Sequence, residues 1–225
     1  LSDSALSDSA LSGSAPHPLL AATDLADLGA VLDFGCRDMA SLVGLAERCP
    51  GLVVHGVTAD KELADRARGA LGGRVALWHR SGPLEPFPGQ YDLAFGVDAS
   101  HRVEDKQALF ARLDAAVVDG GRLLLADYLC TLSGDLVDPG AGISVPTGRT
   151  WAEVFAHNRF VLEELTPGGA PADADADLAE PLRRGWITYR LFHLRKQTSG
   201  SQEDRLRTNR AHLAETTAQP RAPRS

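Results

Sequence analysis

The sequence has 225 residues, of which 44% are hydrophobic and 24% are charged, as expected for one globular domain with a sizeable core. Acidic residues outnumber basic ones by 30 to 23, and the net charge of −7 argues against a nucleic-acid-binding surface. Three cysteines, Cys36, Cys49 and Cys130, lack the spacing of a zinc site or a disulfide framework, so no metal is expected and a reducing, cytoplasmic setting is predicted. No apolar run is long enough to span a membrane, so no membrane partner is expected.

The two ends of the chain differ in composition from the middle. Three copies of one pentapeptide, LSDSA, LSDSA and LSGSA, open the sequence, and such Ser-rich segments bury too little to order themselves. We therefore predict a flexible linker at 1–18, a folded domain at 19–196 and a C-terminal linker at 197–225. Within the last segment, EDRLRTNRAHLAE could form a short helix.

Between these ends, short apolar runs alternate with amphipathic helical patterns. Strands are predicted at Ala30–Cys36, Leu52–Thr58, Arg74–His79, Tyr91–Val97 and Arg122–Leu129, with helices at Met39–Arg48, Lys61–Leu71, Glu104–Val118 and Thr150–His157. Gly120 and Gly121 are expected to end the third of these helices. Phe160–Leu165 and Trp186–Leu194 alternate as two closing antiparallel strands should.

This order predicts a Rossmann-like α/β fold. The sheet would be seven-stranded and mainly parallel, with helices on both faces and a terminal antiparallel hairpin. That is the order of a class I methyltransferase, whereas a dinucleotide-binding fold would continue with parallel strands.

Five segments carry a more specific resemblance: VLDFGC, HGVTAD, EPFPGQYDLAFGVDASHRVEDKQALF, GGRLLLADYL and RRGWITYRLFHLRK. Over residues 30–210 the chain resembles the methyltransferase domains of bacterial modular type I polyketide synthases, in particular the O-methyltransferase type. The resemblance implies S-adenosylmethionine (SAM) as cofactor. It also implies an acyl carrier protein, which would present a phosphopantetheine-bound polyketide, and neighbouring synthase domains as partners. The acceptor would be a β-hydroxyl or enol oxygen in preference to the α-carbon.

The resemblance also implies which residues contact the cofactor. Asp33, Gly35 and Cys36 lie in the turn after the first strand, where glycine lets the chain pass close to a ligand. Thr58 ends the second strand and would bind the ribose hydroxyls, although it is equally well explained as a hydroxyl that caps the next helix. Asp98 follows the fourth strand and would border the cofactor.

Three features of this site depart from the family pattern. Arg37 and Met39 replace glycines and are expected to obstruct the cofactor. Ser81, followed by Gly82, replaces the acidic residue expected to bind adenine and is the remaining candidate in that loop. The segments 131–151 and 166–180 are shorter than the family's lids and predict an open, wet pocket, which suits methyl transfer poorly.

His101 is the candidate catalytic base, because a histidine titrates near neutrality and this one matches the first of a histidine pair in the family. Arg102 replaces the second histidine. The alternative is a loop histidine without a role. His79 and His157 match no motif position.

The three departures together lead to the hypothesis that the fold is kept while SAM binding and methyl transfer are weak or lost. A catalytically silent domain would then act as a structural spacer in the synthase. A third hypothesis is that the domain binds an unrelated small molecule in the same cleft, but no feature of the sequence supports it.

Overall fold

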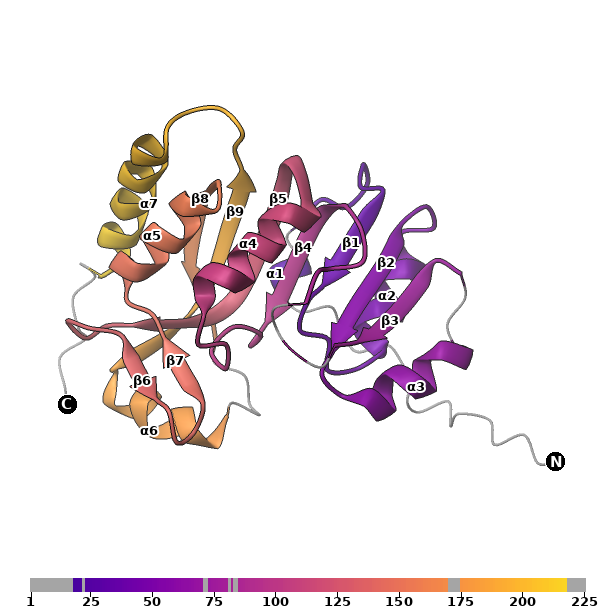
Figure 1. Ribbon diagram of the computed structural model, residues 1–225, viewed down its shortest axis with the longest axis horizontal. Helices are drawn as coiled ribbons and strands as arrows, with labels where there is room; N and C mark the ends of the chain where they lie inside the picture. Colours follow the sequence, from indigo (N-terminus) through magenta and orange to yellow (C-terminus); the bar gives the residue numbers. More distant parts are fainter. Residues whose placement is uncertain are drawn as a thin grey trace.

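A computed structural model describes residues 18–21, 23–70, 73–80, 82, 85–169 and 175–217. A seven-stranded sheet in the order β3-β2-β1-β4-β5-β9-β8 crosses the molecule, with β3 at one edge and β8 at the other (Figure 1). Most of the predicted N-terminal linker and the last residues of the C-terminal one lie outside the described residues.

The strands and helices follow the predicted order. The strands are β1 (Ala30–Asp33), β2 (Val53–Thr58), β3 (Val75–His79), β4 (Tyr91–Val97), β5 (Val117–Cys130), β6 (Leu136–Asp138), β7 (Ile143–Val145), β8 (Phe160–Pro167) and β9 (Ile187–Lys196). The helices are α1 (Pro18–Ala21), α2 (Ala40–Arg48), α3 (Lys61–Ala70), α4 (Lys106–Ala116), α5 (Gly148–His157), α6 (Ala176–Arg184) and α7 (Gln202–Thr217).

The pairing of the strands confirms the predicted fold class. Strands β1 to β5 pair in parallel, and β9 runs antiparallel to both β5 and β8. Because β1 lies between β2 and β4, the chain order reverses at the carboxyl ends of β1 and β4. This is the place where an open α/β sheet binds its ligand.

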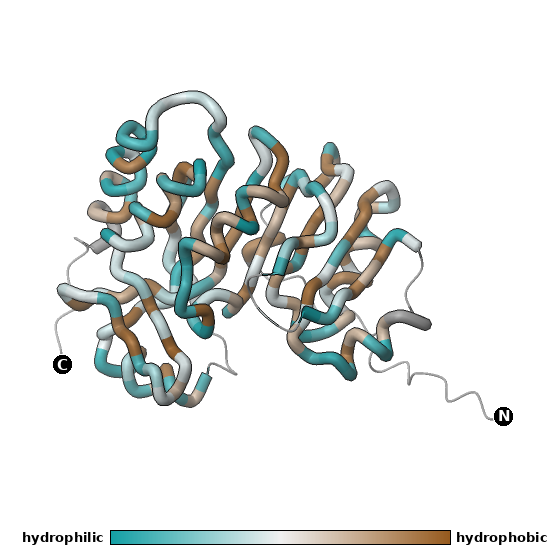
Figure 2. Tube along the Cα trace, in the orientation of Figure 1, coloured by the Kyte–Doolittle hydropathy of each residue, from teal (hydrophilic) through white to brown (hydrophobic). Residues whose placement is uncertain are grey.

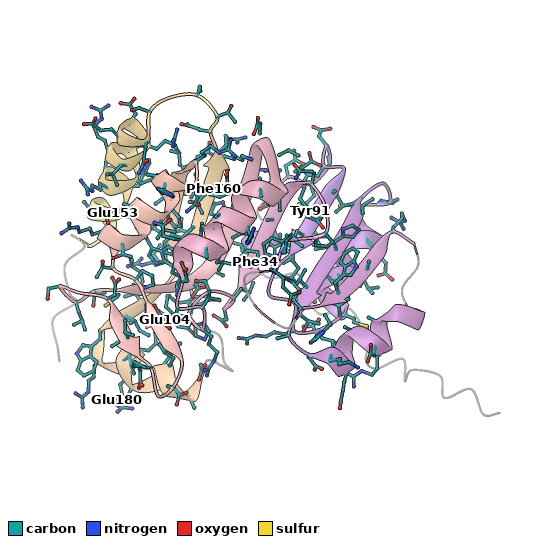
Figure 3. The ribbon with its side chains drawn as sticks, viewed as in Figure 1. Phe34, Tyr91, Glu104, Glu153, Phe160 and Glu180 are labelled. Carbon is teal, nitrogen blue, oxygen red and sulfur yellow. The ribbon has the colours of Figure 1, made fainter. Side chains whose placement is uncertain are left out.

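Two hydrophobic layers cover the faces of the sheet. One contains apolar side chains of α1, α2 and α6, and the other contains those of α4 and α5. Figure 2 shows the hydrophobic residues concentrated along the strands and the inner sides of these helices. Phe34 from the turn after β1 and Phe160 from β8 both belong to the second layer (Figure 3). The parallel strands are therefore buried on both faces, as their apolar runs predict.

The boundary between α4 and β5 differs from the prediction. The helix ends at Ala116, and β5 begins at Val117 rather than after the glycine pair. The register with β4 shifts there, and Gly120 has a φ of +77°. A bulge of this kind lets the strand start early, which a helical pattern running through Val117 cannot reveal.

Two segments that the sequence assigned to loops contain regular structure. Strands β6 and β7 form a small antiparallel hairpin after β5, and α6 precedes β9. Three-residue strands are too short for a periodic pattern, and α6 contains Pro181. Proline argues against a helix from sequence alone.

Helix α7 lies within the range that the sequence assigned to a linker, but it packs against α5 and β8. Its Asn209 and Leu213 are buried. Asn209 accepts a hydrogen bond from the Leu162 N–H at 2.8 Å and donates to the Phe160 carbonyl at 3.1 Å. Residues 202–217 therefore pack as part of the domain.

This contact predicts a stability effect. Asn209→Ala leaves the Leu162 N–H buried without its acceptor, so the free energy of unfolding in urea should fall by roughly 1–3 kcal/mol. Arg207→Ala on the exposed side of the same helix is the control and should stay within about 0.5 kcal/mol. Equal effects of the two substitutions would show that α7 is not held by Asn209.

Candidate active site

A pocket of about 510 Å³ lies at the carboxyl ends of β1, β2 and β4, within the range of small-molecule sites. It is lined by residues of the turns after these strands: Phe34, Gly35, Cys36, Arg37, Val57, Thr58, Ala59, Asp60, Arg80, Gly82, Asp98, Ala99, Arg102 and Val103. Four residues predicted to bind the cofactor, Gly35, Cys36, Thr58 and Asp98, are among them.

Asp33 stabilises the turn that follows β1. Its carboxylate is buried, and Oδ1 accepts a hydrogen bond from the Gly35 N–H at 3.0 Å. Burial raises the pKa of Asp33 to about 7, because a low-dielectric surrounding disfavours the charged form. Cys36 is buried and its Sγ donates to the Asp38 carbonyl at 2.9 Å. Asp33 thus shapes the turn without lining the pocket.

Gly35 is needed for packing between two turns. A Cβ on Gly35 would lie 2.5 Å from the Cβ of Ala99, in the turn after β4. From the sequence, a side chain at this position was expected to collide with a ligand. In the structure, it would collide with Ala99 of the protein itself. This close approach brings the turns after β1 and β4 into contact along one wall of the pocket.

The two residues expected to obstruct the cofactor behave differently. Met39 is buried in the hydrophobic layer with Leu42 and does not line the pocket, so its predicted obstruction is wrong. It lies just before α2. Arg37 does line the pocket, and its Nη1 lies 3.8 Å from Asp98 Oδ2. Of the two residues, only Arg37 is therefore in a position to obstruct the cofactor, as the sequence predicted for both.

At the end of β2, two side chains face the pocket. The Thr58 hydroxyl accepts a hydrogen bond from the Asp60 N–H at 3.1 Å, and Asp60 Oδ1 accepts one from the Leu63 N–H at 3.0 Å. Asp60 is therefore the residue that caps α3. The sequence argument missed Asp60, although its carboxylate stands two residues after the strand, where acidic residues are common in this fold.

The side of the pocket formed by the loop after β3, where the sequence predicted adenine to bind, is only partly described. Ser81 lies outside the described residues, while the neighbouring Arg80 and Gly82 line the pocket. Arg80 is buried, and its guanidinium carbon lies 4.2 Å from the centre of the Phe87 ring. A cation held over an aromatic face in this way is attracted by the ring.

Asp98 combines an unusual backbone with a buried carboxylate. Its φ is +50°, in the left-handed region, and its N–H donates to the Ala126 carbonyl at 2.9 Å. The carboxylate is buried, and Oδ1 has no hydrogen-bond partner among the described residues. Burial, followed by the charge of Asp127, raises the pKa of Asp98. Strained residues with unsatisfied polar atoms are typical of ligand sites.

His101 lies between two carboxylates. Its Nε2 is 3.4 Å from Asp175 Oδ2 and its Nδ1 is 3.9 Å from Asp127 Oδ1, and the side chain is only 2% exposed. Asp127 is itself held by the Ser100 hydroxyl at 2.6 Å. His101 is thus a buried residue with acidic partners. Neither carboxylate was found from the sequence, because both come from distant strands and loops.

The His101 side of the site is covered by the protein itself. The start of α6 covers His101, since Asp175 contacts both His101 and the guanidinium of Arg102. Leu178 anchors the helix in the hydrophobic layer, with no exposed surface. The shortened segment therefore still carries a helix that shields this side chain from water.

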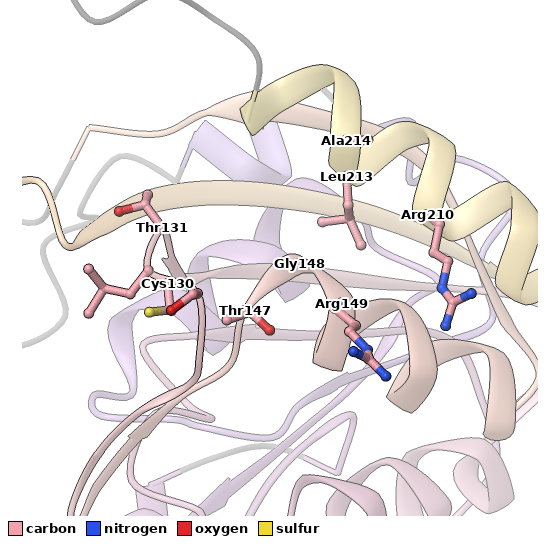
Figure 4. A pocket seen from close by; sticks show the side chains of 10 residues that line it. Cys130, Thr131, Thr147, Gly148, Arg149, Arg210, Leu213 and Ala214 are labelled. Carbon is pink, nitrogen blue, oxygen red and sulfur yellow. The ribbon is translucent and has the colours of Figure 1, made fainter.

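A second pocket, of about 530 Å³, lies where the loop after β5 meets the start of α5 and the end of α7 (Figure 4). Arg149 and Arg210 project beside it, and both contact Glu153, at 3.2 and 3.1 Å. Asp135 accepts a hydrogen bond from the Thr147 N–H at the start of α5. The two arginines and the N-terminal end of α5 therefore already have acidic partners within the chain.

Within the described part of the chain, no group of three or more His, Cys, Asp or Glu side chains is placed to hold a metal ion. Among the same residues, no helix combines the length and apolar character needed to cross a membrane.

The contact between Gly35 and Ala99 predicts a coupled pair of substitutions. Gly35→Ala should lower the free energy of unfolding by roughly 1–3 kcal/mol, because the added methyl group overpacks the two turns. Combining it with Ala99→Gly should recover most of that loss, and denaturant unfolding of the double-mutant cycle measures the coupling. Additive effects would mean that the turns do not meet here.

Asp33 predicts a dependence of stability on pH. Because its pKa is about 7 in the fold and 3.8 ordinarily, the folded state binds the proton more tightly. Its contribution to stability is present below the lower value and is lost as the pH rises through the higher one. Asp33→Asn should remove this loss, so the stability of the variant relative to wild type should increase with pH in urea unfolding. Parallel curves for the two proteins would contradict the assignment.

No family model matches the chain, whereas individual proteins and solved structures do. The chain is 28% identical over 221 residues to the polyketide synthase ThaQ of Burkholderia thailandensis, a match that covers 85% of this chain and 11% of ThaQ. The O-methyltransferase of a trans-AT polyketide synthase multienzyme of Brevibacillus brevis, solved with S-adenosyl-L-homocysteine, superposes with a TM-score of 0.78 at 26% identity, covering 88% of this chain and 76% of that one. The StiE O-MT structure gives a TM-score of 0.74 at 25% identity, with 88% and 78% covered.

These similarities agree with the strand order and with the site at the carboxyl edge of the sheet. The chain spans only about a tenth of the length of the curated relative, with 11% of ThaQ covered. The chain therefore has the fold of a class I methyltransferase, and its sequence is similar to that of methyltransferase domains found in polyketide synthases.

Proposed function

We propose that this domain transfers a methyl group from SAM to an oxygen of a polyketide intermediate that is carried by the phosphopantetheine arm of an acyl carrier protein. The observation that supports the proposal is the pocket of about 510 Å³ at the switch point of the sheet, which is lined by Gly35, Thr58 and Asp98 among others. The relative from Brevibacillus brevis was solved with S-adenosyl-L-homocysteine.

The residues of the pocket fit such a cofactor. Gly35 and Cys36 would lie along its amino-acid part, and Thr58 and Asp60 are placed for its ribose hydroxyls. Asp98 has an unpartnered carboxylate oxygen that suits a positively charged ligand. When bound, SAM supplies a methyl group that is already activated by its sulfonium.

The protein must add positioning of the acceptor and removal of its proton. His101 would be the group that removes the proton, and its Nδ1 lies 3.9 Å from Asp127 Oδ1. Helix α6 keeps water from this side chain. Asp175 lies beside His101 Nε2 at 3.4 Å, so an acceptor that reaches this nitrogen has to displace that carboxylate.

Two contacts favour the second candidate function, a silent spacer. Arg37 pairs with Asp98 across the cofactor pocket, and Asp175 pairs with His101 at the acceptor side. Both contacts fill ligand positions with residues of the chain. A domain that serves only to separate its neighbours would keep its buried layers and need neither position open.

The two functions are distinguished by calorimetry and by a transfer assay with the 225-residue chain. Methyl transfer predicts saturable binding of S-adenosylhomocysteine and incorporation of labelled methyl into a carrier-bound acceptor. No heat of binding and no incorporation, from a chain with a cooperative unfolding transition, would leave the spacer as the function.

Arg37 sets the affinity for the cofactor in this account. Arg37→Gly should strengthen SAM binding by about fivefold, or roughly 1 kcal/mol, because it removes a positive charge from beside Asp98 and from the path of the sulfonium. Met39→Gly is the comparison: it should lower stability without improving affinity, since that side chain packs in the core. A gain in affinity from Met39→Gly alone would refute the distinction between the two positions.

A further inference from the structure

Three buried polar atoms around His101 lack a hydrogen-bond partner among the described residues. They are Asp98 Oδ1, His101 Nδ1 and Tyr128 Oη. The three residues are 7%, 2% and 1% exposed, respectively. Buried polar atoms are normally paired, so several unpaired ones in one place need an explanation. The function proposed above uses Asp98 and His101 separately and gives Tyr128 no role.

Tyr128 connects the other two side chains. Its ring meets the His101 ring edge to face, with the centroids 5.3 Å apart. It also contacts the Tyr189 ring at 5.1 Å, and Tyr189 hydrogen-bonds to Asp98. Asp98 lines the cofactor pocket, whereas His101 is not among the residues that line it. The Tyr128 phenol therefore lies between a residue of the pocket and the buried histidine behind it.

We propose that Asp98, Tyr128 and His101 form one hydrogen-bonded chain, closed directly or through an internal water molecule, by which a positive charge in the cofactor pocket sets the tautomer of His101. Tyr128 is the positioning residue in the middle of this chain. The inference rests on the proposed binding of SAM and goes beyond it, because the base becomes available only when the methyl donor is bound.

Without a cation in the pocket, the protons of the chain point toward Asp175. Burial, followed by the charge of Asp127, raises the pKa of Asp98, which favours a neutral carboxyl group that donates to Tyr128. Burial also raises the pKa of Tyr128, so the phenol keeps its proton and donates to His101 Nδ1. The Nε2–H of His101 then donates to Asp175 Oδ2, 3.4 Å away. A histidine with its proton on Nε2 cannot accept another one there.

The sulfonium of SAM would reverse this order, because an opposite charge within about 4–6 Å favours the ionised form of a carboxyl group. The proton of Asp98 moves to the Tyr128 oxygen, and the proton of Tyr128 moves to His101 Nδ1. The proton on Nε2 passes to the Asp175 carboxylate and from there to solvent, which reaches this 15% exposed side chain. One proton is released in all, and Nε2 is left with the lone pair of a base.

The charged groups around the chain leave this switch free to operate. Asp127 is 3.9 Å from His101 Nδ1, and it already accepts hydrogen bonds from the Ser100 N–H and hydroxyl. Arg37 lies 3.8 Å from Asp98, but its side chain is 54% exposed, so solvent screens its charge. The remaining cations are bound elsewhere: Arg102 to the Ala141 carbonyl and Asp175, and Lys106 to the carbonyls of Val103 and Ser144.

Packing alone does not account for the Tyr128 hydroxyl. Phenylalanine would fill the same place in the hydrophobic layer without bringing an unpaired polar atom into it. Another buried tyrosine, Tyr91, bonds to His55 Nδ1 at 2.9 Å. It begins β4 and lies at the opposite end of that strand from the cofactor pocket. The Tyr91–His55 pair is therefore a matched control.

The test is nuclear magnetic resonance of the 225-residue chain with isotope-labelled histidine at neutral pH, in which His101→Gln identifies the His101 signals. Without ligand, the ring nitrogens should show the proton on Nε2. Saturating SAM should move it to Nδ1. S-adenosylhomocysteine lacks the positive charge on sulfur and should leave it on Nε2. Calorimetry in buffers of different ionisation enthalpy should find about one proton released per SAM bound and about none per S-adenosylhomocysteine.

Tyr128→Phe breaks the chain and keeps the packing. At saturating SAM, His101 of this variant should keep its proton on Nε2. Without ligand, its Nδ1 resonance should shift, because that nitrogen loses its donor. Tyr91→Phe removes the same kind of hydroxyl and should leave the His101 signals and their response to SAM unchanged. The comparison of SAM with S-adenosylhomocysteine needs no variant and stands even if Tyr128→Phe fails to fold.

The outcomes separate this inference from the proposed function. A proton on Nδ1 without ligand, a proton that stays on Nε2 at saturating SAM, or a Tyr128→Phe variant that still switches would each overturn the inference and leave methyl transfer standing. Absence of SAM binding would refute the proposed function and the coupling to the cofactor. The hydrogen-bonded chain itself would then be refuted if Tyr128→Phe left the Nδ1 resonance in place.

Discussion

The close approach of two turns at the carboxyl edge of the sheet determines the geometry of the site. The turn after β1 and the turn after β4 meet at Gly35 and Ala99, where there is no room for another methyl group. Arg37 lies beside Asp98 near this contact, and His101, which follows in the same turn after β4, lies between Asp127 of β5 and Asp175. One packing constraint thus brings the residues of the candidate site together.

The sequence predicted the fold well because the parallel strands are buried on both faces. Their apolar runs, separated by helical patterns, predict the strand order, and the alternation in β9 predicts the closing antiparallel pair. The start of β5 was misplaced because the bulge at Gly120 depends on pairing with β4. Strands β6 and β7 and helix α6 were missed because the strands have only three residues each and the helix contains Pro181.

The site was predicted less completely, for a related reason. Motif positions mark the ends of strands, and Gly35, Cys36, Thr58 and Asp98, which were chosen on this basis, line one pocket. The direction of a side chain is not encoded in a motif, so Met39 was wrongly expected to point at the ligand. Asp175 is far from His101 in the sequence, and only the packing of α6 brings them together.

Acidic and basic residues of the chain pair with one another around the candidate site. Arg37 reaches Asp98 in the pocket at the carboxyl ends of the strands, and Asp175 reaches His101 and Arg102. The most direct test of this account is a crystal structure of the chain with S-adenosylhomocysteine. The account predicts ordered ligand between Gly35, Thr58 and Asp98, with Arg37 displaced from Asp98. An Arg37–Asp98 pair that persists at saturating ligand, with no ligand density over the turn after β1, would contradict it.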